Sequence, residues 1–323
     1  MSYLRPLTLG SLILPSNIFY SPLAGCSDYP YRKMAALYRP GLFFCEMVKI
    51  EALIRYDTNT LRMLDYDKDM HPIGAQICGS NPTRAKQAAK IIEDLGFDLI
   101  DLNCGCPVDK VTKDGSGSGM LKNPELIGEM LTAILSTVQI PVTVKIRIGW
   151  DESSINAVAI TKIAEQAGAK LISIHGRTRK QGYAGPANWT PITNCKKAAT
   201  SIHIIGNGDV FSGEMAKKLF EQTKCDGLLV SRGTLGKPWI IEEIISTLEG
   251  KPFTISQEQI KSVLLRHISY ILQYQEKKRT LLEIRKVACW YLRDHKGMKM
   301  LREWINKAKS VKEALETIQN YPW

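Results

Sequence analysis

The sequence predicts an α/β fold: a (β/α)8 barrel over residues 1–250, followed by an all-helical four-helix bundle over residues 251–323. Between residues 17 and 248, eight short apolar runs alternate with longer amphipathic ones, which is the number and length typical of such a barrel. After residue 250 only apolar positions at helical spacing remain. An open, doubly wound sheet is the competing arrangement, but eight consecutive units favour closure.

The eight apolar runs are expected to be parallel strands. Their hydrophobicity is nearly continuous and many of their residues are β-branched, as in strands that are buried on both faces. The expected strands cover residues 17–25, 42–48, 72–78, 98–104, 141–149, 171–176, 203–209 and 227–233.

Capping residues mark the expected helix boundaries. Asn81 and Pro82 open a helix that Gly96 is expected to end. In the C-terminal segment, Ser256 and Ser310 each precede Gln or Glu by three residues, which is the pattern of a capping box. The apolar stripes of these helices are read as bundle core.

The positive charge is concentrated in the C-terminal segment. Residues 251–323 hold 15 Lys and Arg against 7 Asp and Glu, a net charge of +8, whereas the rest of the chain carries only +3. This imbalance suggests contact with a polyanion, and the alternative is a solvated helical face rich in lysine. Lys286 and Arg293, seven residues apart on one helix, are expected on the outside of the bundle.

Several classes of protein are excluded by composition. No apolar run reaches the ~18 residues that a membrane helix needs. The start of the chain lacks the apolar core and the cleavage site of a signal peptide. Eight scattered cysteines without such a signal indicate reduced thiols, and Cys104 and Cys106 are spaced C-x-C, which is not a zinc spacing. We therefore expect a cytoplasmic protein, monomeric, without a metal ion and without a membrane anchor.

The chemistry is expected at the carboxyl ends of the strands, where barrels of this kind build their active sites. Gln76, Lys145 and His175 are polar residues within otherwise apolar strands, which is costly unless they meet a ligand or a polar network. The glycine-bearing turns at residues 207–209 and 231–233 follow the last two strands, where such barrels commonly bind phosphate.

Taken together and in order, the strand ends are similar to those of one family. The segments "SPLAG", "AQICGS", "DLNCGCP", "VKIRIGW", "IHGRTR", "GNGD" and "SRG", and "RKVACWYL" in the helical tail, resemble the tRNA-dihydrouridine synthases. The resemblance implies an FMN-dependent enzyme that reduces the 5,6 double bond of D-loop uridines in tRNA, with NADPH as the electron donor.

The resemblance also implies a role for each strand-end residue. Cys106 is the general acid. The expected flavin contacts are Pro22, Leu23, Ala24, Gln76, Lys145 and His175, and the expected phosphate contacts are Asn207, Gly208, Asp209, Ser231, Arg232 and Gly233. The expected substrate contacts are Asn103, Arg177, Thr178, Lys113, Lys286 and Arg293.

The chemistry of the residues agrees with these roles. Hydride addition at C6 of uracil leaves charge at C5, and an ordinary thiol, with a pKa near 8.5, is mostly protonated at pH 7 and can supply that proton. Cys106 is expected to be this thiol, and Cys104 an inert residue at the end of a buried strand. Lys145 beside the flavin would stabilise its reduced, anionic form.

Two further expectations concern loops and alternatives. The glycine-rich segment 113–120 is expected to be a mobile loop that closes over the substrate, with Lys113 as a phosphate contact. A flavin barrel acting on a free pyrimidine is one alternative function. A catalytically silent, RNA-binding barrel is the other.

Overall fold

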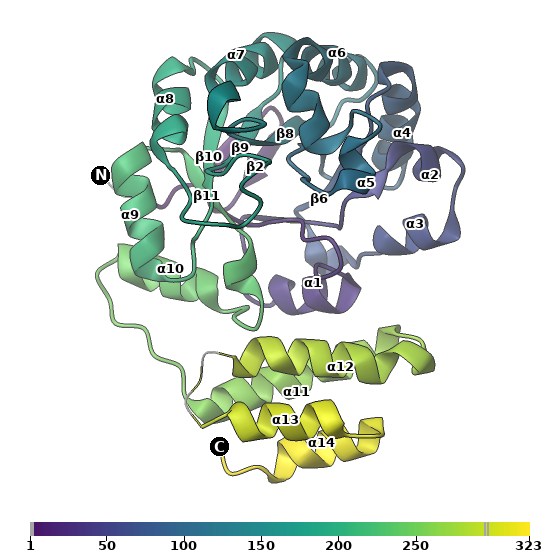
Figure 1. Cartoon of the computed structure of the whole chain (residues 1–323), viewed down its shortest axis with the longest axis vertical. Coiled ribbons are helices and arrows are strands. Elements are labelled where there is room, and N and C mark those ends of the chain that lie inside the picture. Colours follow the sequence, from purple (N-terminus) through teal and green to yellow (C-terminus); the bar gives the residue numbers. More distant parts are fainter. Residues whose placement is uncertain (1–2, 294, 296) are drawn as a thin grey trace.

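The structure, a computed structural model, describes residues 3–293, 295 and 297–323. It consists of a barrel of parallel strands surrounded by helices, with a separate layer of helices beside it (Figure 1). Both parts agree with the predicted architecture.

The barrel strands pair in sequence order and the sheet closes on itself. Each strand is parallel to its neighbours, and the pairs β4–β6 and β11–β3 complete the circle. A short strand, β5 (Val48–Lys49), extends the edge of β6 after β4 ends. The eight strands of the barrel are β3 (Ile18–Tyr20), β4 (Leu42–Phe44), β6 (Ile73–Cys78), β7 (Leu99–Cys104), β8 (Val142–Arg147), β9 (Leu171–His175), β10 (His203–Asn207) and β11 (Gly227–Val230).

Helices follow the strands and cover the outside of the barrel (Figure 1). They are α1 (Tyr29–Ala36), α2 (Ile50–Ile54), α3 (Thr58–Met63), α4 (Pro82–Asp94), α5 (Asp109–Thr112), α6 (Pro124–Leu135), α7 (Ala157–Ala167), α8 (Thr190–Ala198), α9 (Gly213–Thr223) and α10 (Ile240–Leu248). Short 3-10 turns cover Lys68–Met70, Gly117–Lys122, Glu152–Ser154 and Arg232–Thr234.

An N-terminal hairpin, which the sequence reasoning missed, closes one end of the barrel. It pairs β1 (Leu7–Leu9) with β2 (Leu12–Leu14) in antiparallel register. Its leucines pack with Phe19, Leu99 and other residues near the starts of the barrel strands in one buried cluster. Burial of this apolar surface stabilises the closed end.

The described residues of the C-terminal segment form four helices, as predicted: α11 (Gln257–Tyr274), α12 (Lys277–Leu292), α13 (Lys299–Lys307) and α14 (Val311–Asn320). They share a hydrophobic core that also takes in Trp239, which precedes α10 of the barrel. A linker between α10 and α11 joins the two parts along one side (Figure 1). The division at residue 250 stays an interpretation.

The barrel and the helical segment approach each other closely at Gly236. This residue has φ +74°, and a Cβ placed there would lie 2.3 Å from the backbone carbonyl carbon and oxygen of Trp290 in α12. Only glycine fits, because any side chain would overlap the backbone of the helix.

The predicted helix caps are largely confirmed. Asn81 accepts a hydrogen bond from the backbone of Arg84, and Gly96 follows the helix with φ +85°. Ser256 forms a reciprocal capping box with Gln259. Ser310 caps α14, but the Glu313 carboxylate accepts from the backbone N–H of Lys309 instead, so the second capping box is incomplete.

Candidate active site

A cavity of about 430 Å³ lies at the carboxyl ends of the barrel strands, and we call it the strand-end cavity. The barrel register brings together residues that are far apart in the sequence, because the ends of parallel strands share one edge. Every residue expected to contact the flavin or its phosphate lines this cavity, as do Asn103 and Cys106. Further lining residues include Cys26, Met47, Arg147, Tyr183 and Phe211.

A chain of buried hydrogen bonds connects three strands below the cavity. Thr143 donates to Asp101 at 2.6 Å, and Gln76 donates to the other carboxylate oxygen at 2.7 Å. The Gln76 carbonyl in turn accepts from Asn103 at 2.7 Å. Burial raises the pKa of Asp101 to about 6, against the opposing effect of the bonds from Gln76 and Thr143. The network fixes the orientation of both amide side chains.

Asn103 holds the loop that carries Cys106. Its carbonyl oxygen accepts from the backbone N–H of Cys106 at 2.9 Å and from that of Gly105 at 3.1 Å. The carbonyl of Cys106 accepts from the backbone N–H of Ser118 at 3.0 Å and from its hydroxyl at 2.8 Å. The backbone on both sides of the Cys106 thiol is therefore anchored.

The two neighbouring thiols differ in exposure. Cys106 is partly exposed and lines the cavity, whereas Cys104 is fully buried in β7. Burial raises the pKa of Cys104 well above its ordinary value, because a thiolate there would lose its hydration. Of these two thiols, only Cys106 has the access that a proton donor requires.

Lys145 presents its ammonium group to the cavity from a partly buried position on β8. Burial lowers its pKa to about 8, with the nearby Arg147 as a second cause and Asp101 acting in the opposite direction. A desolvated cation is costly unless an acceptor or an anion compensates it. The lining of the cavity therefore favours a ligand with electronegative atoms beside Lys145.

A cluster of arginines surrounds Asp209 at one end of the cavity. Arg177 donates to both carboxylate oxygens, at 2.8 and 2.7 Å, and Arg232 donates to one at 3.2 Å. The guanidinium of Arg177 also lies 3.3 Å from Nε2 of His175. Arginine only donates, so Nε2 accepts and the neutral imidazole carries its proton on Nδ1. The pKa of His175 is well below its ordinary value, through burial and the positive charge of Lys145 and the arginines.

The last two strand ends form tight turns around this cluster. Gly208 and Asp209 both have positive φ, +124° and +56°. At Gly233, a Cβ would lie 2.1 Å from the backbone oxygen of Val210, so only glycine fits. Such turns expose backbone N–H groups, which bind anions well.

Three expected contacts need correction. Arg177 and Thr178 are buried, with exposed fractions of 3% and 0%, and neither lines the strand-end cavity, so their expected substrate contacts do not fit this arrangement. The Asp209 carboxylate orients Arg177 and Arg232 and would repel a phosphate, so any phosphate contact there falls to its backbone.

The expected mobile loop is also different. Residues 116–118 are buried, and Asp114 and Ser116 both accept from Lys49 at 2.7 Å. Because Ser118 donates to the backbone carbonyl of Cys106, the segment supports the loop that carries the thiol and does not form a lid. Lys113 is exposed and lies outside the strand-end cavity.

Sequence reasoning missed Asp101, Arg147 and Tyr183. Asp101 is a carboxylate in a mostly apolar strand, which signals a buried partner, and Arg147 shares a strand face with Lys145 by the alternation of side chains. Tyr183 stacks at 4.2 Å on the Arg232 guanidinium, but it follows no strand and had no such signal.

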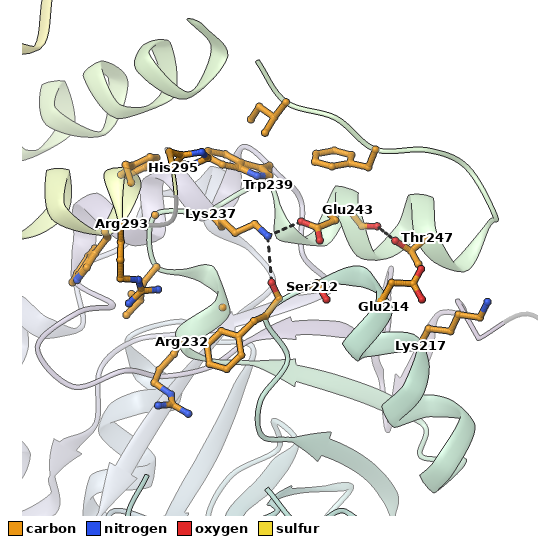
Figure 2. Close-up of a pocket in the computed structure, with 18 of the residues that line it drawn as sticks. Ser212, Glu214, Lys217, Arg232, Lys237, Trp239, Glu243, Thr247, Arg293 and His295 are labelled. Atoms are coloured by element: carbon orange, nitrogen blue, oxygen red, sulfur yellow. Dashed lines mark hydrogen bonds and ion pairs between the residues drawn. The ribbon is translucent and has the colours of Figure 1, made fainter. Parts of the chain in front are cut away.

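A larger cavity of about 970 Å³, the junction cavity, is lined by residues of both the barrel and the helical segment (Figure 2). Basic and aromatic side chains from both parts line it, including Lys217, Lys237, Phe253, Trp290 and Arg293. Lys237 is engaged with the Phe211 carbonyl at 3.2 Å and with Glu243 at 2.7 Å. Phe211, Arg232, Gly233 and Leu235 line both cavities, which are therefore neighbours.

Lys286 does not point outward as expected. Its ammonium donates to the backbone carbonyl of Gly25 in the barrel at 3.0 Å and pairs with Glu283. Arg293 is exposed and lines the junction cavity. Among the described residues, no helix is long and apolar enough to cross a membrane, and no group of three His, Cys, Asp or Glu side chains is arranged for a metal ion.

Comparison with solved structures shows the same fold at low identity. A variant of NCR from Zymomonas mobilis is 16% identical with a TM-score of 0.56, covering 80% of this chain and 95% of that one. Histamine dehydrogenase from Rhizobium sp. 4-9 is 13% identical with a TM-score of 0.57, covering 82% of this chain and 50% of that one.

Comparison with curated sequences gives closer relatives. The probable tRNA-dihydrouridine synthase 1 of Synechocystis sp. is 35% identical over 97% of this chain and 88% of the relative. The tRNA-dihydrouridine synthase B of Pseudomonas aeruginosa is 34% identical over 97% of this chain and 95% of the relative. The family model for dihydrouridine synthase matches residues 19–322. The chain therefore belongs to the dihydrouridine synthase family.

Proposed function

We propose that this chain reduces the 5,6 double bond of uridine in tRNA, with FMN as the bound hydride carrier and NADPH as the electron donor. One observation carries the proposal: a partly exposed thiol, a partly buried ammonium group and two glycine-bearing turns line a single cavity. The tRNA-dihydrouridine synthases named above support the choice of substrate. The enzyme is proposed to act in the cytoplasm as a monomer.

The cavity fits FMN by its donors. Lys145 and Gln76 offer N–H groups to the electronegative edge of the ring, and the loop of Pro22, Leu23 and Ala24 offers backbone contacts. The turns around Gly208 and Gly233, with Arg232 beside them, suit the phosphate. When bound, FMN supplies the hydride that reaches C6 of the uracil.

The protein supplies the proton and the positions of the reactants. Cys106 Sγ–H donates to C5 as its C–C double bond is reduced, and the resulting thiolate regains a proton from solvent. Asn103 acts mainly on the backbone of the Cys106 loop, which keeps the thiol at a fixed place on the cavity wall. Because His175 is neutral, the positive charge in the cavity is carried by Lys145 and the arginines.

Purified protein is expected to contain about one FMN per chain and to be yellow, because the cavity offers both a ring site and a phosphate site. Absorbance of the released flavin against protein concentration measures this ratio. A colourless protein that takes up no added FMN would refute the flavin proposal.

RNA contact is proposed for the helical segment and the junction cavity. Replacing Lys217, which lines that cavity from the barrel, and Arg293, which lines it from the position just after α12, with alanine should reduce the salt dependence of tRNA binding. Each lost phosphate contact lowers the magnitude of the slope of log affinity against log salt by roughly 0.7–0.9. The slope of the double variant should therefore be smaller by about one to two.

The matched control replaces Lys86 and Lys162, which are exposed on α4 and α7 of the barrel, with alanine. Its slope should stay within about half a unit of the wild type, since neither residue lines the junction cavity. Equal slopes in both double variants would remove this cavity from the RNA-binding surface.

A further inference from the structure

A charged side chain of the helical segment binds the backbone of the loop after β3. Lys286 of α12 donates to the Gly25 carbonyl at 3.0 Å, across 261 residues of sequence. On the other side of the same residue, the Gly25 N–H donates to the carboxylate of Glu46. Both backbone polar groups of Gly25 are thus bonded to ionisable side chains from different parts of the chain.

The position of Lys286 is itself fixed. It forms an ion pair with Glu283, one turn earlier on α12, and its ammonium lies 5.3 Å from the centre of the Trp290 ring. The side chain is 31% exposed. A lysine whose ammonium group already contacts a carbonyl, a carboxylate and an aromatic ring is poorly placed to bind an RNA phosphate.

The ammonium group of Lys286 offsets the negative charge of the carboxyl groups around Gly25. Asp28, Glu46 and Glu283 surround it, and Lys286 acts to lower the pKa values of Asp28 and Glu46, which burial raises. Arg32 is the other nearby cation, but its guanidinium is already bonded to backbone carbonyls of the same region, including that of Ser27. Without Lys286, the carboxylates would repel one another beside the loop.

The held loop forms part of the wall of the strand-end cavity. Pro22, Leu23 and Ala24 line it immediately before Gly25, and Cys26 lines it immediately after. We propose that Lys286 is a positioning residue that makes the helical segment hold this loop in the conformation that binds FMN. This inference rests on the proposed function, because it concerns the flavin site.

The test compares three single variants in the full chain. Lys286→Met removes the charge and keeps the aliphatic length against Trp290, Lys286→Arg restores a charged donor, and Lys278→Met is the control on an exposed position of the same helix. FMN affinity of the flavin-free protein is measured by fluorescence quenching, and tRNA affinity is measured over a salt series.

The expected result separates the two affinities. Lys286→Met should weaken FMN binding about tenfold, as for the loss of one charged hydrogen bond, while the salt slope of tRNA binding stays unchanged. Lys286→Arg should recover most of the FMN affinity, and Lys278→Met should keep all of it. If circular dichroism shows that Lys286→Met is unfolded, Lys286→Gln, which keeps a neutral donor, takes its place with the same expected direction.

Two results would overturn the inference. FMN affinity equal to wild type in Lys286→Met, with a reduced salt slope, would make Lys286 an RNA contact. If neither the FMN affinity nor the salt slope of tRNA binding changed, the contact between Lys286 and Gly25 would have no effect on the FMN-binding conformation of the loop. Failure of the proposed function looks different, because the wild-type protein itself would then bind no FMN.

Discussion

Replacing Cys106 with alanine is expected to lower the rate of dihydrouridine formation by about 10²–10⁴-fold, the usual effect of removing a general acid. FMN binding and its reduction by NADPH should persist. The loop should keep its shape, because Asn103 and Ser118 hold it through the backbone of residue 106 and not through the thiol. Dihydrouridine in tRNA after single-turnover reaction measures the first effect, and anaerobic bleaching of the flavin measures the second.

Cys104 provides the matched control two residues away. It is fully buried and its high pKa keeps it protonated without access to the cavity, so Cys104→Ala should stay within about tenfold of the wild-type rate. A large loss in Cys104→Ala with a small loss in Cys106→Ala would show that the proton donor has been assigned to the wrong thiol.

Replacing Lys145 with methionine is expected to weaken FMN binding by about tenfold to a hundredfold, since a partly buried charged donor is lost while the side-chain volume is nearly kept. Reduction of the bound flavin by NADPH should also slow, because the ammonium group expected beside the ring no longer offsets the negative charge of the reduced form. Equilibrium titration with FMN and stopped-flow absorbance measure the two effects. Lys162→Met, on the exposed face of α7, is the control and should change neither.

The same residue predicts opposite pH dependences for two quantities. With a pKa of about 8, Lys145 loses its proton as the pH rises from 7 to 9, so the affinity for FMN should fall over that range. The unfolded chain keeps an ordinary lysine, which binds its proton up to about pH 10.4. Folded protein therefore binds fewer protons between these values, and the contribution of Lys145 to the free energy of unfolding without flavin should rise with pH. Lys145→Met should abolish both trends, and a wild-type affinity that does not change with pH would contradict the assigned role.

The strand ends could be predicted because a barrel converts sequence position into spatial position. Residues such as Gln76 and Lys145 lie on different strands, yet both follow the same rule that the carboxyl ends share one rim. Arg177 lies two residues beyond the end of β9, and its side chain is buried. Strand periodicity does not extend to that position and so could not predict its burial. The hairpin of β1 and β2 was missed because three-residue strands are too short for a periodic signal.

The direction of Lys286 could not be predicted for a similar reason. A helical repeat distinguishes the bundle core from its surface, but it does not tell which part of that surface meets the barrel. The partner of Lys286 is a backbone carbonyl, which has no signature in the sequence. Segment 113–120 was misjudged because glycine indicates a turn equally well in a mobile loop and in a tightly packed one.

The close approach of Gly236 to Trp290 has a consequence for how a uridine would be selected. Because the backbones of the barrel and of α12 meet there with no room for a side chain, this contact opposes sliding of the two parts past each other. The distance between the junction cavity and the Cys106 thiol would then stay constant, and the enzyme would select its target by that distance. A uridine would be modified according to its distance from the gripped phosphates, and the shape of the folded RNA would matter more than the bases beside the target.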